Sequence, residues 1–163
     1  MASLLKIATF NCRGLAGHKK RNEVFTWLKD KHFHLILLQE THSTETVEKL
    51  WMEEWGSKII FNHGSSNSRG VCILISRALD CDIVETKSIV GGRLQLVTVK
   101  TFDQIFNIFN IYAPNDDDNM FYDVNLKLIE SDYSNNPCII AGDFNCVLDT
   151  NIDKRGGSHL YNK

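Results

Sequence analysis

The sequence has 163 residues, of which 43% are hydrophobic and 23% charged, a composition typical of one globular domain with a sizeable core. The 18 Lys and Arg residues nearly balance the 20 Asp and Glu residues, so the net charge is -2. This balance argues against a strong, sequence-independent grip on nucleic acid, which needs a basic face. An enzyme that cuts nucleic acid is not excluded, because a site that holds a metal is locally acidic.

The cysteines and the N-terminus narrow the class further. The sequence has 5 cysteines without a CxxC pair, which predicts reduced thiols in an intracellular protein rather than a zinc site or a disulfide framework. The opening "MASLLKIATF" is too short for a signal peptide, and no apolar run approaches membrane-spanning length. We therefore expect a protein that is not secreted and contacts no membrane, and the composition points to no particular protein partner.

The first half of the chain alternates between β-rich runs and helical patterns. A β-rich run at about 4–11 predicts the first strand, and consecutive apolar residues predict a buried strand over 34–40. Between these strands, residues 21–32 carry apolar side chains at helical spacing, namely Val24, Trp27 and Leu28. The chain thus begins with a strand, a helix and a second strand.

A second helix is predicted after this strand. Ser43 or Thr44 can cap it, and Glu45 is favourably placed in its first turn. Its apolar stripe consists of Val47, Leu50, Trp51 and Trp55.

The middle of the chain changes character. The β-rich runs "KIIFN", "GVCILIS", "CDIVETKSIV", "RLQLVTVKT" and "QIFNIFNIYA" leave no room for helices, and Gly91-Gly92 is a strong hairpin signal. This pattern predicts an antiparallel meander.

A third helix and a last strand complete the predicted elements. The helix lies in "DDDNMFYDVNLKLIES", capped by Asp116 to Asp118, with Phe121, Val124 and Leu128 facing inward, and "PCIIAGDFN" is the strand. The predicted class is α+β with a mostly antiparallel sheet and helices that cover a sheet face.

Polar side chains stand where four of the apolar runs stop. The runs end in Asn11, in Glu40, in Tyr112 followed by Asn115, and in Asp143 with Asn145. Ligand sites form where strand ends and their loops converge. The set is rich in oxygen and contains no Cys or His cluster, so it favours a hard cation such as Mg²⁺ or Mn²⁺.

These residue types suggest separate roles in binding a metal, a water and a phosphate. Glu40 is suited to bind a metal through its carboxylate, with Asn11 beside it. Asp143 and Asn145 are suited to position an attacking water. Tyr112 and Asn115 fit hydrogen-bond donors to a phosphate. Each residue taken alone is equally an ordinary turn former or strand-end cap, so the hypothesis depends on the four ends together.

Five motifs in order carry a resemblance to a known family. The segments "TFNCRGL", "LLQETH", "RGVCILIS", "NIYAPN" and "IIAGDFNCVLD" resemble the endonuclease/exonuclease/phosphatase superfamily, which includes deoxyribonuclease I and the exonuclease III-type apurinic endonucleases. The "QETH", "NIYAPN" and "GDFN" forms look most like the endonuclease domain of non-LTR (LINE-type) retrotransposon proteins. A single motif would be weak, but five in order are specific.

The resemblance implies a four-layer α/β/β/α sandwich and Mg²⁺-dependent phosphodiester hydrolysis, with DNA as substrate and a nuclear location. It implies that Glu40 binds the metal beside Asn11, and that Asp143 and Asn145 orient the water. Tyr112 and Asn115 would contact the scissile phosphate.

The sequence departs from the family pattern at its C-terminal end. Family members continue into further strands and a terminal Ser-Asp-His motif, whereas Ser158-His159 here has no Asp between its members. Residues 1–163 are therefore expected to be a single, C-terminally truncated domain, the N-terminal portion of the sandwich. We expect its activity to be impaired, and its first sheet to lack a packing partner.

Other residues and functions remain open at this point. His42 is a possible rim residue of the site, with an exposed loop role as the alternative. Arg69, Lys154 and Arg155 fit phosphate contacts or plain solvated charges. The competing functions are a DNA-nicking endonuclease, a phosphatase acting on inositol phosphates or sphingolipids, and an inactive fragment or binding remnant.

Overall fold

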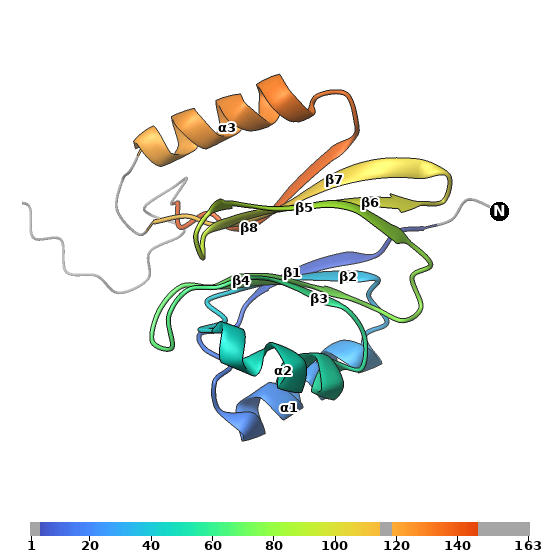
Figure 1. Cartoon of the computed structure of the whole chain (residues 1–163), viewed down its shortest axis with the longest axis vertical. Helices are drawn as coiled ribbons and strands as arrows, with labels where there is room; N and C mark the ends of the chain where they lie inside the picture. The colour runs from blue at the N-terminus through green and yellow to red at the C-terminus, as the bar shows by residue number, and fades with distance from the viewer. Residues whose placement is uncertain (1–3, 115–118, 147–163) are drawn as a thin grey trace, which may run out of the picture.

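Two β-sheets pack face to face in the computed structural model, which describes residues 4–114 and 119–146. Helices α1 (His18–Asp30) and α2 (Glu48–Trp55) cover the outer face of one sheet, and α3 (Asn119–Tyr133) covers the outer face of the other (Figure 1). The predicted α+β class and the four-layer α/β/β/α arrangement are thus confirmed. None of the helices in these residues is long and apolar enough to cross a membrane.

The first sheet has the strand order β1-β2-β4-β3. Its strands are β1 (Ile7–Asn11), β2 (Leu35–Gln39), β3 (Ile59–Asn62) and β4 (Val71–Ile75). β1 runs parallel to β2, while β4 is antiparallel to both β2 and β3. Every residue of β2 and β4 is buried, as their continuous apolar runs predict for strands covered on both faces.

The second sheet has the strand order β5-β6-β7-β8. Its strands are β5 (Asp82–Val90), β6 (Leu94–Thr101), β7 (Gln104–Tyr112) and β8 (Cys138–Asp143). The first three form an antiparallel meander, and β8 returns parallel to β7 after α3. The predicted meander is therefore divided, because β3 and β4 belong to the first sheet and only β5 to β7 run on consecutively in the second.

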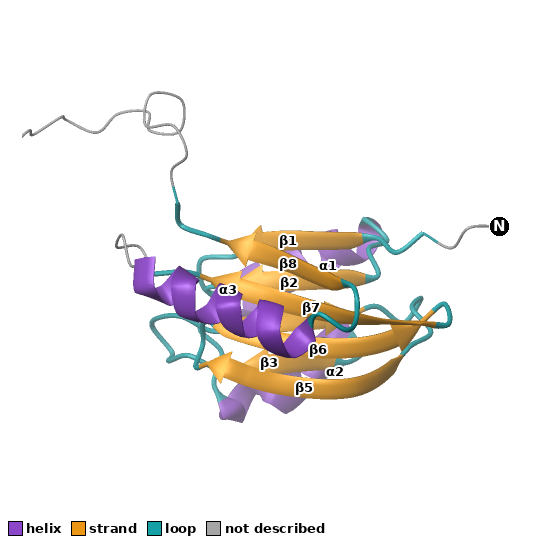
Figure 2. Cartoon of the chain, turned by 90° about the horizontal axis from the view of Figure 1, so that it is seen from above, coloured by secondary structure: helices purple, strands orange, loops and turns teal. Residues whose placement is uncertain are grey.

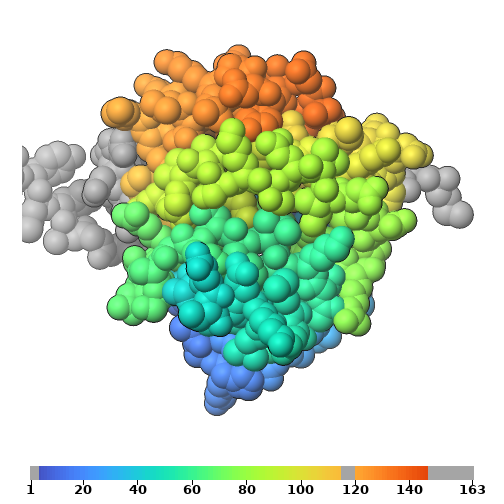
Figure 3. All heavy atoms as spheres, in the orientation of Figure 1, coloured from blue at the N-terminus to red at the C-terminus, as the bar shows by residue number. Residues whose placement is uncertain are grey.

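Three apolar clusters separate the layers. One lies between the first sheet and its two helices, and another lies between the second sheet and α3. The third joins the sheets to each other through side chains such as Leu37 and Ile73 from the first and Val97 and Ile108 from the second. The expectation that the first sheet lacks a packing partner is wrong, because β5 to β8 supply one. Figure 3 shows the outer surface with α3 and the α1–α2 layer at opposite ends.

Several local predictions differ from the structure in the faces that the helices bury. α1 buries Phe25 and Leu28, while Trp27 is 49% exposed. Leu50 of α2 is likewise exposed. Val124 of α3 is exposed as well, because the buried positions of that helix fall at Phe121 and four and eight residues later.

The predicted N-cap is confirmed in position, because Thr44 is the N-cap residue of the helical turn before α2, but its hydroxyl makes no capping hydrogen bond. A short 3-10 helix, Glu45–Val47, precedes α2, and within the described residues neither hydroxyl caps it. The Ser43 hydroxyl instead contacts Thr41 Oγ1 at 3.1 Å and His63 Nδ1 at 3.0 Å, and Thr44 Oγ1 lies 2.9 Å from Thr46 Oγ1. Three predicted caps, Asp116 to Asp118, lie outside the described residues.

One end of the sandwich collects the C-terminal ends of β1, β2, β7 and β8 (Figure 2). β1 and β8 are edge strands of different sheets, and they contact each other across the sandwich. The β5–β6 turn reaches the same end and includes Arg93 besides the predicted Gly91-Gly92. These four strand ends are the ones that carry the predicted site residues.

Buried amides fix the two sheets relative to each other just below this end. Asn110 of β7 donates through Nδ2 to the backbone oxygens of Leu38 and Cys72, each at 3.0 Å, and its Oδ1 accepts from Gln39 Nε2 at 2.7 Å. Both side chains are at most 1% exposed. Apolar packing is non-directional, whereas these hydrogen bonds favour one alignment of the sheets.

Candidate active site at the strand ends

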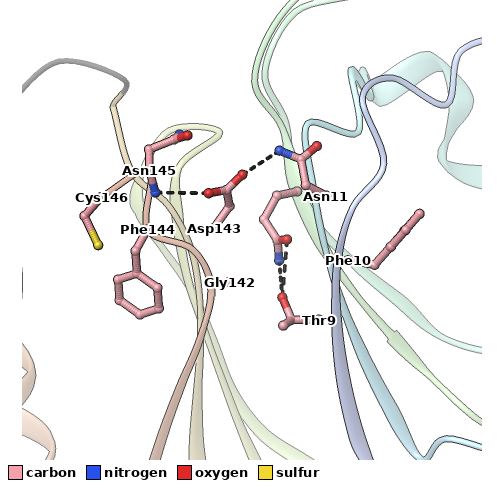
Figure 4. Close-up of a pocket in the computed structure, with 9 residues that line it drawn as sticks. Thr9, Phe10, Asn11, Gly142, Asp143, Phe144, Asn145 and Cys146 are labelled. Carbon is pink, nitrogen blue, oxygen red and sulfur yellow. Dashed lines mark hydrogen bonds between the residues drawn. The ribbon is translucent and has the colours of Figure 1, made fainter. Parts of the chain in front are cut away.

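Asn11 stands between the carboxylates of Glu40 and Asp143 at the end of the sandwich. Its Nδ2 donates to Glu40 Oε1 at 2.8 Å and to Asp143 Oδ2 at 2.7 Å. Glu40 follows β2 in the same sheet, whereas Asp143 ends β8 in the other sheet. One amide group with two hydrogens therefore holds two carboxylates from different sheets side by side, and Figure 4 shows its contact with Asp143.

A pocket of about 490 Å³ opens beside this group, between the two edge strands. Asp143 points across it toward Asn11, and Phe144 turns away (Figure 4). The pocket is lined by Thr9, Phe10, Asn11, Gln39, Gly142, Asp143, Phe144, Asn145 and Cys146.

Asp143 and Asn145 form a tight turn. The backbone N–H of Asn145 donates to Asp143 Oδ1 at 3.0 Å, so both oxygens of the carboxylate are engaged. The Asn145 side chain donates to the backbone oxygen of Ala113 at 2.8 Å, which ties the turn to the end of β7. Asp143 is therefore held rigidly, with its carboxylate facing the other sheet.

Several backbone conformations in the left-handed region lie at this end of the molecule. Glu40 has a φ of 52°, Arg13 of 47°, His42 of 55° and Asn145 of 45°, all in the left-handed region that side chains rarely adopt. Such conformations cost of order 1–3 kcal/mol each and cluster at functional sites. Strain in three of the predicted site residues, Glu40, His42 and Asn145, supports a functional reading of these turns.

Tyr112 lies in the same site and is 8% exposed. Burial, and then the hydrogen bond with the Glu40 carboxylate, raise the pKa of the Tyr112 hydroxyl above its ordinary value. The phenol is thus a neutral donor at neutral pH. The Arg93 guanidinium sits over its ring, with Cζ at 5.2 Å from the centroid, and donates to the Tyr112 backbone oxygen at 3.3 Å.

The donor set suits one class of metal. Within residues 4–114 and 119–146, no three Cys, His, Asp or Glu side chains gather as they would in a zinc site. Two carboxylates and an amide do meet, and Mg²⁺ is usually held by one or two carboxylates with waters and substrate phosphate. Glu40 and Asp143, assisted by Asn11, fit Mg²⁺ or Mn²⁺.

One predicted residue in the described part of the chain stands apart from this cluster. His42 is half-buried at the same end of the sandwich, where its ring packs against Gly14 so closely that a Cβ on Gly14 would lie 2.9 Å from Nδ1. Asn115 lies outside the described residues. The structure thus brings together Asn11, Glu40, Tyr112, Asp143 and Asn145, whose roles in substrate binding stay predictions.

A comparison with known proteins gives the site its family context. The model of the Endonuclease/Exonuclease/phosphatase family matches residues 8–161, nearly the whole chain. The chain belongs to this family. The match covers all the strand ends described above, and it confirms the resemblance that the five sequence motifs carry.

Individual relatives agree with this assignment. A Xenopus laevis protein, "Transposon TX1 uncharacterized 149 kDa protein", is 31% identical over 159 residues, which are 94% of this chain and 12% of that protein. Among solved structures, D. rerio TDP2 complexed with a single strand DNA product matches with a TM-score of 0.66 at 16% identity, over 91% of this chain and 63% of that one.

A second solved structure, an AP endonuclease from Archaeoglobus fulgidus, matches with a TM-score of 0.56 at 23% identity, over 86% of this chain and 57% of that one. At these identities the two structures show the family fold alone. The chain spans less than two thirds of both, and about an eighth of the transposon protein.

Sequence reasoning missed several residues that shape this site. Arg93 follows Gly91-Gly92, so the sequence predicts its place at the tip of a hairpin. The sequence does not predict that this hairpin lies beside Tyr112. Gln39 and Asn110 interrupt apolar strands, and an amide in such a run is a recognisable sign of a buried hydrogen-bonded bridge.

Proposed function

We propose that this member of the family is a divalent-metal-dependent DNA endonuclease domain of a transposon-derived protein, which nicks DNA by phosphodiester hydrolysis. The observation that carries the proposal is the Asn11 amide that joins Glu40 and Asp143 across the two sheets. The likeness to the TX1 transposon protein supports the biological setting, and a DNA substrate would place the protein in the nucleus.

Glu40 and Asp143, with Asn11, would hold Mg²⁺ or Mn²⁺. When bound, such an ion supplies Lewis-acid polarisation of a phosphoryl oxygen. The remaining roles belong to side chains of the chain itself. Tyr112, whose hydroxyl hydrogen bonds to Glu40 in this structure, would give that hydrogen to a phosphate oxygen when substrate is bound, and Arg93 beside it would offset the charge that develops there.

The hydrolysis adds one water molecule across a P–O bond. Asp143, fixed by Asn11 and by the Asn145 turn, orients the water, whose oxygen bonds to phosphorus while a proton leaves. The bond from phosphorus to the leaving oxygen breaks, and that oxygen keeps the electron pair and gains a proton. Asn115 stays in the proposal as a phosphate contact, and His42 as a rim residue.

DNA is favoured over a small phosphorylated substrate for two reasons. The TX1 relative belongs to a transposon, and the TDP2 structure contains a single strand DNA product. The site is also an open groove between two edge strands rather than an enclosed cavity for a headgroup.

The test is conversion of supercoiled plasmid to nicked circle by the purified chain in Mg²⁺. We expect nicking that EDTA abolishes and that Glu40→Gln lowers about a hundredfold or more, because the substitution removes a metal carboxylate. Glu53→Gln is the matched control, since the Glu53 side chain is 63% exposed on α2, where it pairs with Lys49. Equal rates for Glu40→Gln and wild type would overturn the proposal.

Two further arms distinguish the competing functions. Release of phosphate from an inositol phosphate, with plasmid left intact, would show a phosphatase. A melting temperature that Mg²⁺ does not raise, together with no activity, would show a remnant without a metal site, since a bound ion stabilises the folded state by mass action.

The truncation expected from the sequence stays a prediction. It is tested by comparing this chain with a version extended through a Ser-Asp-His motif. A rate for the extended version at least about tenfold higher would support impaired activity in residues 1–163.

A further inference from the structure

Asn62, at the end of β3, uses the whole hydrogen-bonding capacity of its side chain on a single target. Its Nδ2 donates to the backbone oxygens of Val90 and Leu94, each at 3.0 Å. Its Oδ1 accepts from the backbone N–H of Gly92 and from the Ser88 hydroxyl, each at 2.8 Å. The side chain is 4% exposed, so these four bonds form away from water.

The target is the β5–β6 hairpin, which belongs to the other sheet. Asn62 is in the first sheet, and all four of its partners lie between Ser88 and Leu94 in the second. The hairpin also accepts a hydrogen bond from the loop before β4, because the Gly70 N–H donates to the Gly92 oxygen at 3.0 Å. The tip is packed so tightly that a Cβ on Gly92 would lie 3.0 Å from the His63 oxygen.

The hairpin places Arg93 at the site. The Arg93 N–H donates to the Val90 oxygen at 3.0 Å, and the Arg93 oxygen accepts from the Tyr112 N–H at 2.7 Å. Asn62 thus holds Gly92 of the turn and the strand residues Val90 and Leu94 on either side, and Arg93 next to Gly92 places a guanidinium over the Tyr112 ring.

We infer that Asn62 is a positioning residue, which acts on the reaction through Arg93 by templating the hairpin from the opposite sheet. The inference rests on the proposed function, because it gives Arg93 a role at the phosphate. Val90 and Leu94 flank the turn in the apolar cluster under α3, but apolar packing is non-directional, so the directional bonds from Asn62 fix where the turn places Arg93. Misplacement of a charged group by about 1 Å is enough to lower a rate substantially.

A double-mutant cycle on plasmid nicking tests the inference. We expect Asn62→Ala to lower kcat/KM about tenfold in the wild-type background and less than about twofold when Arg93→Ala is already present. A residue with a merely structural role would lower the rate by the same factor in both backgrounds, and that result would overturn the inference.

Asn107→Ala is the matched control. Asn107 is also a buried asparagine of the second sheet, with hydrogen bonds to Thr98 and to the Tyr133 backbone, but it lies in the interior of β7 and, within the described part of the chain, bonds to no residue of the β5–β6 turn. Its effect should be the same with and without Arg93.

If Asn62→Ala fails to fold, Ser88→Ala replaces it, because the hydroxyl of this exposed residue donates one of the four hydrogen bonds of Asn62. A smaller loss that also vanishes without Arg93 is then expected, and an equal loss in both backgrounds would again contradict the inference.

Amide hydrogen exchange separates this inference from the proposed function, because it requires no activity. In Asn62→Ala we expect the Gly92 N–H to exchange at least about tenfold faster, while the core amides of Val97 and Ile108 keep their protection. Unchanged protection at Gly92 would overturn the templating role whether or not the protein nicks DNA. If the wild type does not nick DNA but Asn62→Ala shows the expected faster exchange at Gly92, the proposed function is refuted and the positioning of the hairpin by Asn62 still holds.

Discussion

Asn11 Nδ2 lies 2.7 Å from Asp143 Oδ2, although 132 residues separate them and they belong to different sheets. The same nitrogen donates to Glu40 at 2.8 Å. A site that depends on two sheets works only when those sheets keep one alignment. The buried bridge between Gln39 and Asn110 directly beneath the site supplies a physical reason for that alignment.

Replacing Asn11 by Ala should weaken Mn²⁺ binding by about 10- to 100-fold, because the amide that orders both carboxylates is lost. Titration of the metal followed by electron paramagnetic resonance measures the change. Asn67→Ala, in the exposed loop before β4, is the control and should bind Mn²⁺ like the wild type. An unchanged affinity in Asn11→Ala would show that the amide does not organise the metal ligands.

Replacing Tyr112 by Phe should lower the nicking rate about 10- to 100-fold, because a hydrogen-bond donor to the phosphate is removed. Tyr133→Phe, near the opposite end of β7, should leave the rate within about twofold. Equal losses in the two variants would argue against a direct role for the Tyr112 hydroxyl.

The raised pKa of Tyr112 also predicts a pH dependence of stability. The folded state holds the phenolic proton more tightly than the unfolded state, whose pKa is near 10.0. This contribution is fully present below pH 10 and is lost as the pH rises through the folded-state pKa. The melting temperature of wild type should therefore fall relative to Tyr112→Phe only above pH 10. A difference that already changes between pH 7 and 9 would contradict this assignment.

Replacing Gly142 by Ala should destabilise the fold by about 2–4 kcal/mol. Gly142 has a φ of +149°, and a Cβ there would lie 1.9 Å from the Ile111 backbone oxygen on the neighbouring strand. Urea unfolding measures the loss. Gly91→Ala is the control, because a Cβ there meets nothing within 4 Å, so its effect should stay within about 0.5 kcal/mol. Similar midpoints for the two variants would remove the steric explanation for glycine in the "GDFN" motif.

The thiols should differ sharply in reactivity. Burial raises the pKa of Cys12 to about 12, and burial also raises the pKa of Cys72 well above its ordinary value. Cys138 and Cys146 are exposed. Under native conditions a disulfide reagent such as DTNB should label these two first, and Cys12 and Cys72 only after unfolding. Rapid labelling of all thiols in the folded protein would contradict the burial of Cys12 and Cys72.

Much of the fold was predictable because it depends on local pattern. Continuous apolar runs indicate buried strands, and β2 and β4 are buried throughout. The errors occurred where a pattern leaves several answers open. Trp27 and Leu50 are large and apolar at helical spacing, but the sheet beneath each helix accommodates a stripe shifted toward Phe25 and Trp51. A helix's buried face depends on the packing angle, which neighbouring residues do not encode.

The division of the strands between two sheets was beyond the sequence for a related reason. Strand formation is local, but the choice of partner depends on how apolar faces meet at long range. The expectation of a missing partner sheet was wrong because β5 to β8 already cover the inner face of the first sheet.

From residue types and their positions at strand ends, the amino-acid sequence alone was sufficient to select Asn11, Glu40, Tyr112, Asp143 and Asn145, and the family match confirms the resemblance that joins them. Only the tertiary structure shows that one amide spans two carboxylates, and that Asn62 of one sheet holds the hairpin that presents Arg93 from the other. Contacts of this kind join residues far apart in the chain. They are set by how two separate sheets align, which is a property of packing and of buried hydrogen bonds rather than of any local run of residues.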